Sequence, residues 1–241
     1  MKKNGATLLL KSLVNQKIEK VFGVPGESYL SVLDALNDFP EISWIGARQE
    51  GGAAFMAAGY AQLTGNTGIC FVTRAPGATN ASIGVHTAFQ GSIPLILFIG
   101  QVSSMVSGRE AFQELNYNEM YSGMAKWVTE INDVNRVPEI VSRAFNIANT
   151  GRPGPVIVSL PEDIISMSCE MSPSLRIRFP EPSISNFDID EVREKLSISK
   201  NPIFIVGGTG WKKDGIKNLK SFIEQNNLPV ISSFRRQDIF D

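Results

Sequence analysis

The sequence predicts an α/β fold: a parallel sheet with helices on both faces, followed by part of a second α/β domain. Short apolar runs recur through the first 160 residues, and segments with helical spacing separate them. Strands that are apolar on both faces and alternate with helices indicate a parallel sheet that is covered on both sides. The pattern stops after residue 161 and resumes near residue 188.

The N-terminal segment predicts an amphipathic helix. Its apolar residues follow helical spacing: Leu9, Leu10, Leu13, Val14 and Ile18. A signal peptide is the competing interpretation, because two lysines precede the short apolar run. Lys11 interrupts that run and no small-residue cleavage site follows it, so the sequence favours the helix.

Apolar runs and helical segments then alternate along the chain. The predicted strands span 20–25, 42–47, 68–73, 94–100, 126–131 and 155–161. The predicted helices between them span 28–38, 50–64, 77–90 and 136–149. Residues 101–127 are polar and lack a clear period, and long irregular segments inside compact α/β domains are often functional.

Composition divides the chain into three parts. Residues 1–165 form the first predicted domain, and the Pro- and Ser-containing stretch 166–187 is a predicted linker. Residues 188–241 begin a second domain with predicted helices at 188–199 and 213–226 and predicted strands at 202–208 and 228–233. A parallel sheet of two strands would leave its apolar faces uncovered, so we expect this second domain to be truncated.

Composition and charge exclude several classes of function. Hydrophobic residues make up 43% of the chain, charged residues 20%, and the net charge is −1. Such a chain has no global field for nucleic acid or an anionic membrane, and no apolar stretch is long enough to span a bilayer. Cys70 and Cys169 form no metal pattern, and we expect Cys70 to pack as a small hydrophobe. We therefore expect a cytoplasmic protein without a nucleic-acid or membrane partner.

Five motifs occur in an order that resembles thiamine diphosphate-dependent enzymes of the acetolactate synthase type. They are VFGVPGES, RQEGGAAFMAAGYAQLTG, GICFVTRAPGATNASIGVHTAFQGSIPLILFIGQV, GREAFQE and TGRPGPVIVSLPEDI. The resemblance covers roughly residues 5–165 and, more loosely, 186–241. It implies a pyrimidine-binding first domain and the start of a central domain, with a diphosphate-binding C-terminal domain missing from this chain.

Glu50 is a lone acid that leads into a helix of small and apolar residues. By its position alone, it is an acid that interacts favourably with the helix dipole. The resemblance implies that Glu50 is catalytic and hydrogen-bonds atom N1′ of the cofactor's aminopyrimidine ring. A carboxyl group kept from water readily shares a proton with a weakly basic ring nitrogen, which makes the 4′-amino group a source of the base for the thiazolium C2 proton.

Turns after two predicted strands carry the other expected cofactor contacts. α/β sheets bind ligands at the carboxyl ends of their strands, and a Pro-Gly pair favours a tight turn there. The resemblance implies contacts with the pyrimidine end of the cofactor at Pro25, Gly26, Glu50, Thr73, Pro76, Gly77 and Asn80. The alternative for Pro25 and Gly26 is an ordinary strand-to-helix turn. Glu27 and Ser28 depart from the Gly-Gly-Ala that is usual in acetolactate synthases, which leaves the substrate open.

The remaining expected site residues lie later in the chain. The resemblance places Phe112 and Gln113 over the thiazolium, with Gln113 also catalytic, and places Lys126 near the substrate entrance. It implies a contact of Arg152 with FAD, an optional second cofactor. The alternatives are a loop with one buried aromatic residue, a solvated lysine and an arginine that anchors its loop. No Gly-Asp-Gly motif is present, so Mg²⁺ and the diphosphate are expected on the missing C-terminal domain, with no metal ligands in this chain.

The resemblance implies decarboxylation of a 2-keto acid followed by carboligation. The first alternative is a simple decarboxylase, or a lyase acting on 2-hydroxyketones or 2-hydroxyacyl-CoA. The second is a non-catalytic partner module. We expect a homodimer or homotetramer, with contacts through the small-residue helices 50–61 and 77–88, and we expect this chain alone to be inactive.

Overall fold

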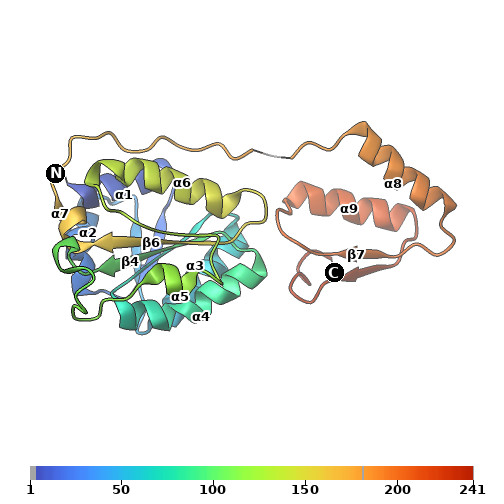
Figure 1. Ribbon diagram of the computed structural model, residues 1–241. Helices are drawn as coiled ribbons and strands as arrows, with labels where there is room; N and C mark the ends of the chain where they lie inside the picture. Colours follow the sequence, from blue (N-terminus) through green and yellow to red (C-terminus); the bar gives the residue numbers. More distant parts are fainter. Residues whose placement is uncertain (1–3, 181, 241) are drawn as a thin grey trace. The chain divides into compact units, whose positions relative to one another are not determined.

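The computed structural model describes residues 4–180 and 182–240. The chain divides into two compact units, Met1–Phe179 and Pro180–Asp241. The first unit contains a six-stranded, fully parallel sheet with the strand order β2-β1-β3-β4-β6-β5 (Figure 1). Its strands are β1 (Lys20–Gly23), β2 (Ser43–Gly46), β3 (Gly68–Val72), β4 (Leu95–Gln101), β5 (Trp127–Glu130) and β6 (Pro155–Pro161).

Helices cover both faces of this sheet, as the sequence predicts (Figure 1). One face packs against α1 (Gly5–Asn15), α2 (Leu30–Ala35), α6 (Val137–Asn149) and α7 (Glu162–Ser166). The other packs against α3 (Glu50–Thr64), α4 (Ala75–Gly91) and α5 (Tyr117–Tyr121). Alternate residues of β3 supply the two cores: Ile69 and Phe71 face the first set, and Cys70 and Val72 face the second. No helix in the described part of the chain is both long and apolar enough to cross a membrane.

Small residues let α3 and α4 pack at very short range. A Cβ atom on Gly84 would lie 2.4 Å from the Cβ of Ala54, which is closer than real side chains approach. Gly68 is equally confined, because its Cβ would lie 2.3 Å from the carbonyl oxygen of Ala57. The alanine- and glycine-rich sequence therefore brings α3 close to both α4 and the sheet.

The predicted helix 28–38 is not continuous. It consists of the 3-10 helix η1 (Glu27–Tyr29), α2 and the 3-10 helix η2 (Leu36–Asp38). Tyr29 leaves the helical conformation, with φ −143° and ψ 35°, and its buried hydroxyl donates a hydrogen bond to the carbonyl of Val24. The change from η1 to α2 occurs at this buried residue. The irregular segment 101–127 contains the 3-10 helix η3 (Ser104–Val106) and the short helix α5.

The segment after α7 is only partly free of the first unit. Ser168 forms an isolated bridge with Asn4, and the amide of Ser174 donates to the hydroxyl of Ser12 on α1 at 3.1 Å. The amide of Ile177 donates to the side chain of Gln16 at 3.0 Å. The first half of the predicted linker 166–187 therefore packs along α1.

The second unit contains the elements that the sequence predicts, with slightly shorter strands. They are α8 (Asn186–Ile198), β7 (Phe204–Val206), α9 (Lys213–Gln225) and β8 (Val230–Ser232). β7 and β8 form a two-stranded parallel sheet. Large apolar side chains on or next to this sheet are exposed, among them Ile205, Ile231 and Phe234. Within the second unit, the apolar surface of this small sheet is therefore only partly covered.

Candidate functional site

The order of the strands places the position where open α/β sheets bind ligands at the carboxyl edge of the large sheet, between β1 and β3, and we call this expected binding position the crevice. β1 lies between β2 and β3, so the chain leaves β1 in one direction and later returns on its other side. Loops after two such strands diverge, and the space between them is where open α/β sheets bind ligands. Pro25 and Gly26 follow β1, and Thr73 and Pro76 follow β3. The fold thus brings together two of the predicted cofactor turns.

Close contacts hold these two turns against each other. A Cβ atom on Gly26 would lie 2.4 Å from the Cβ of Thr73, so only glycine fits there. The hydroxyls of Thr73 and Ser28 are hydrogen-bonded at 2.8 Å. A Cβ on Gly77 would lie 3.0 Å from Thr73 Cγ2 and 3.5 Å from Glu50 Oε1. Gly77 therefore leaves a small space beside the Glu50 carboxylate that a larger residue would fill.

Glu50 is the first residue of α3 and is directed toward α4. Its Oε2 accepts a hydrogen bond from Asn80 Nδ2 at 2.9 Å, whereas Oε1 has no hydrogen bond among the described residues. The preceding Gln49 caps the helix by accepting from the amide of Gly52. Burial raises the pKa of the Cys70 thiol on β3, and the negative charge of Glu50 raises that pKa further. Cys70 is thus a neutral, fully buried core residue, as predicted.

The solvent exposure of Glu50 differs from the expectation. The side chain is half-buried rather than kept from water by this chain. Its carboxylate lies at the helix start, so the favourable helix dipole and the role implied by the resemblance are compatible. Within the first unit, the Glu50 carboxylate therefore keeps part of its contact with solvent.

Gln113 joins the site through its backbone. The amide of Ala75, at the start of α4, donates to the carbonyl of Gln113 at 3.3 Å. Gln113 has φ +64°, in the left-handed region that non-glycine residues rarely adopt. The Glu114 carboxylate fixes this loop by accepting from the amides of Gly108 at 2.6 Å and Ala111 at 3.1 Å, and these bonds lower the pKa of Glu114. The neighbouring Phe112 is 74% exposed, so the alternative of a buried aromatic residue is wrong.

Arg74 and Glu27 form an ion pair across the two turns that the sequence does not predict. Arg74 Nη2 donates to Glu27 Oε1, and the side chains are 10% and 69% exposed, respectively. Arg74 Nε and the hydroxyl of Tyr117 are buried without a hydrogen-bond partner in residues 4–180 and 182–240. Both residues occur in quoted motifs, but 47 positions separate them and only the fold brings them together.

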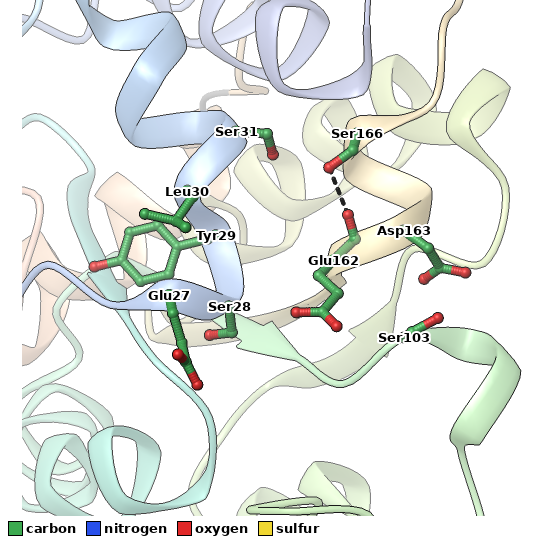
Figure 2. A pocket seen from close by; sticks show the side chains of 9 residues that line it. All are labelled: Glu27, Ser28, Tyr29, Leu30, Ser31, Ser103, Glu162, Asp163 and Ser166. Carbon is green, nitrogen blue, oxygen red and sulfur yellow. Dashed lines mark hydrogen bonds between the residues drawn. The ribbon is translucent and has the colours of Figure 1, made fainter.

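A hollow of about 410 Å³ opens beside Glu27 at the same edge of the sheet. Figure 2 shows Glu27, Ser28 and Ser31 on one side and Glu162, Asp163 and Ser166 of α7 on the other. Asp163 accepts from the backbone amide of Ser104 at 2.9 Å, so its carboxylate is already engaged. Sequence patterns give no signal for this hollow, because the segments that follow β1, β4 and β6 come together at one edge only when the sheet has formed.

Comparisons with known proteins agree with this arrangement. Residues 3–120 match the family described as thiamine pyrophosphate enzyme, N-terminal TPP binding domain. Residues 3–120 belong to this family of thiamine pyrophosphate-binding domains. The chain is 36% identical over 234 residues to the acetolactate synthase large subunit of Lactococcus lactis, an alignment that covers 95% of this chain and 41% of the relative.

Other relatives in the thiamine diphosphate-dependent family give the same result. The Escherichia coli acetolactate synthase isozyme 3 large subunit is 35% identical over 236 residues, covering 95% of this chain and 41% of the relative. The Haemophilus influenzae acetolactate synthase large subunit is 36% identical over 240 residues, covering 97% and 42%. The predicted family and the predicted α/β fold are confirmed. The chain spans about two fifths of the length of these relatives.

Two predicted residues of this family lie away from the crevice. Lys126 directly precedes β5 and Arg152 lies just before β6, so both are at the amino edge of the parallel sheet. Lys126 Nζ donates to the carbonyls of Ile147 and, at 2.8 Å, Thr150, and burial lowers its pKa. Arg152 Nε donates to the hydroxyl of Ser92 at 2.7 Å. The structure therefore separates Lys126 from Phe112 and Gln113, and it gives Arg152 the anchoring contacts of the alternative interpretation.

Proposed function

We propose that this chain works within an enzyme that decarboxylates a 2-keto acid and joins the remaining acyl unit to a second carbonyl compound, as an acetolactate synthase does. The observation that carries the proposal is the Glu50 carboxylate, oriented by Asn80 and left with one open oxygen in the crevice between β1 and β3. Residues 1–165 are the proposed pyrimidine-binding domain, residues 166–187 the linker, and residues 188–241 the beginning of a central domain.

The residues at the crevice fit the aminopyrimidine end of thiamine diphosphate. Gly77 leaves room beside Glu50 Oε1, and Thr73 and Gly26 fix the wall of that space. When bound, the cofactor supplies the nucleophilic carbon on which a 2-keto acid loses CO₂. Glu50 holds a proton against N1′ of the pyrimidine ring, Asn80 keeps the carboxylate in place, and Pro25 and Pro76 shape the two turns. Gln113 and Phe112 lie on the loop that borders this space, where they meet the substrate.

The proposed reaction is balanced by one proton. Two 2-keto acid anions and one proton give one 2-hydroxy-3-keto acid anion and CO₂. The donor's bond between C1 and C2 breaks, a new carbon–carbon bond forms to the acceptor's carbonyl carbon, and the acceptor's carbonyl oxygen takes the proton. The acceptor thus keeps its carboxylate throughout.

We place Mg²⁺ and the diphosphate outside this chain. Among the described residues, no group of three or more His, Cys, Asp or Glu side chains is arranged to hold a metal ion. FAD is an optional further cofactor, for which the resemblance offers Arg152 on the exposed amino edge. A flavin absorption spectrum of the purified protein tests that option directly.

We further propose that a second subunit covers α3 and α4, giving a homodimer or a homotetramer of such dimers. The outward side of α3 carries Phe55, Met56 and the 88% exposed Leu63, while Gly52 and Gly59 have open space beside them. Ile83 on α4 is also exposed. A subunit on this face would complete the desolvation of Glu50. The free, buried cysteines Cys70 and Cys169 support the proposal of a cytoplasmic location.

A product assay tests the proposed function. The full-length protein, supplied with thiamine diphosphate and Mg²⁺, is given pyruvate with and without a second carbonyl compound. We expect CO₂ release and a carboligation product. Aldehyde as the sole organic product would favour a decarboxylase, and cleavage of a 2-hydroxyacyl-CoA would favour a lyase. Absence of cofactor binding would favour the non-catalytic module.

A further inference from the structure

We propose that Arg74 binds the carboxylate that the substrate retains during the reaction, and that Glu27 occupies the same guanidinium until substrate arrives. The inference rests on the proposed function and adds a residue that determines specificity. It starts from the ion pair that joins the turns after β1 and β3.

The burial of the two partners is unequal. The Arg74 side chain is 10% exposed and that of Glu27 is 69% exposed. A buried guanidinium requires an anionic partner, because leaving it unpaired away from water is strongly unfavourable. Here that partner is a solvent-facing carboxylate on the single-turn helix η1. Another carboxylate of the same charge and shape can replace it from the solvent side.

The guanidinium also has hydrogen-bonding capacity that Glu27 does not use. Glu27 accepts from Nη2, whereas Nε is buried and without a partner in the described parts of the chain. Nε and an adjacent Nη can bind the two oxygens of one carboxylate together, which is the arrangement arginine favours. The Tyr117 hydroxyl is similarly buried and unpartnered. Burial raises the pKa of Tyr117, and the positive charge of Arg74 partly offsets that rise. The Tyr117 hydroxyl and the Arg74 guanidinium are therefore close enough to interact.

Arg74 is also placed among the groups that meet cofactor and substrate. It follows Thr73 directly, and the next residue, Ala75, binds the backbone of Gln113. Glu27 borders the hollow beside η1 (Figure 2). A carboxylate that displaces Glu27 would therefore arrive next to the proposed reacting centre.

The chemistry selects which carboxylate Arg74 binds. The donor loses its C1 carboxyl group as CO₂, and a strong cationic contact to that group would stabilise the ground state and slow the step. A retained carboxylate has no such conflict. Two sources supply one: the acceptor 2-keto acid, or the distal end of a dicarboxylic donor.

Kinetics of the full-length protein with thiamine diphosphate and Mg²⁺ test the inference. In the acceptor arm, pyruvate is the donor and 2-ketobutyrate is compared with uncharged butanedione as acceptor. In the donor arm, 2-ketoglutarate is compared with 2-ketobutyrate. In one of the arms, Arg74→Gln should lower the ratio of kcat/KM for the compound that keeps a carboxylate through the reaction over the compound that does not by about 10- to 100-fold, the range of a charge-assisted hydrogen bond. The arm that responds identifies the source of the carboxylate.

Glu27→Gln should act in the opposite direction. The Glu27 carboxylate would no longer compete for Arg74, so KM for the compound that keeps its carboxylate should fall several-fold. Loss of a purely structural ion pair would not improve binding. Arg74→Lys keeps the positive charge but cannot bind both oxygens of a carboxylate through a planar guanidinium, so its ratio of kcat/KM values should lie between those of wild type and Arg74→Gln. This variant replaces Arg74→Gln in the test if Arg74→Gln does not fold. Unchanged ratios in both arms would overturn the inference. Absence of CO₂ release from the wild-type protein would instead overturn the proposed function.

Discussion

The two edges of the large sheet both carry polar and charged side chains in turns. They differ in whether the chain itself provides hydrogen-bond partners for these side chains. At the amino edge, Lys126 donates to two backbone carbonyls and Arg152 to Ser92. At the carboxyl edge, the described part of the chain offers no hydrogen-bond partner to the buried Arg74 Nε or to the buried Tyr117 hydroxyl, and it offers none to Glu50 Oε1. A polar group in a turn points to a ligand when the chain itself leaves it unsatisfied, and it points to structure when the chain satisfies it.

The largest expected effect tests the acid at the carboxyl edge. Glu50→Gln should slow exchange of the thiamine diphosphate C2 proton by about 10²- to 10⁴-fold, because an amide cannot exchange a proton with N1′. Exchange in D₂O is followed by proton NMR on the full-length protein. The matched control is Glu41→Gln, which removes the same charge just before β2 at the amino edge. Exchange at the wild-type rate in the Glu50 variant would mean that the acid at the carboxyl edge has no role in activating the cofactor.

The packing that positions this edge predicts a loss of stability. Gly84→Ala places a Cβ 2.4 Å from Ala54 Cβ, so α3 and α4 must separate. Overpacking of this kind should lower the free energy of unfolding by about 1–3 kcal/mol, measured by urea denaturation. Gly123→Ala, in the turn after α5, is the control, because open space surrounds a Cβ added there and the position is not on the proposed subunit interface. Its free energy of unfolding should change little. Equal stability of the two variants would mean that close packing does not hold the site.

A smaller effect is expected at the amino edge. Lys126→Met removes two hydrogen bonds to the end of α6, which should lower the free energy of unfolding by about 1 kcal/mol. Thermal denaturation measures this change, and steady-state kinetics measure KM for the 2-keto acid. A raised KM with unchanged stability would support a position of Lys126 near the substrate entrance. It would also contradict a purely structural role for the polar residues of the amino edge.

The most local effect depends on pH. Backbone amides of Gly108 and Ala111 lower the pKa of Glu114, so the ionised carboxylate holds the loop that carries Gln113. The ordering is complete above the pKa of an unfolded glutamate, about 4.3, and is lost as the pH falls through the lowered value. The protection factors of these two amides, which compare their exchange with that of an unfolded chain at the same pH, should therefore fall only in acid. Glu114→Gln should show fast exchange at neutral pH, and pH-independent protection in wild type would exclude this role.

The sequence predicts the local elements of the first unit well, because their signals are local. Apolar runs identify β3, β4 and β6, and the small-residue run after Glu50 identifies α3 with both of its ends. The helix expected at 28–38 is helical but is divided into two 3-10 helices and one α-helix, a division that the apolar spacing does not reveal. Half of the expected linker packs along α1 through hydrogen bonds to Ser12 and Gln16, which no periodicity reveals.

The sequence by itself determined the α/β class and the thiamine diphosphate-dependent family, and it singled out Glu50 as the proposed catalytic acid, since each depends on short motifs and their order. Only the tertiary structure decided which polar groups share a space. Strand order placed Arg74 beside Glu27 and moved Lys126 to the far edge. Hydrogen-bond satisfaction is a property of neighbours in space, and residues that are far apart in the chain become neighbours only when the sheet has formed.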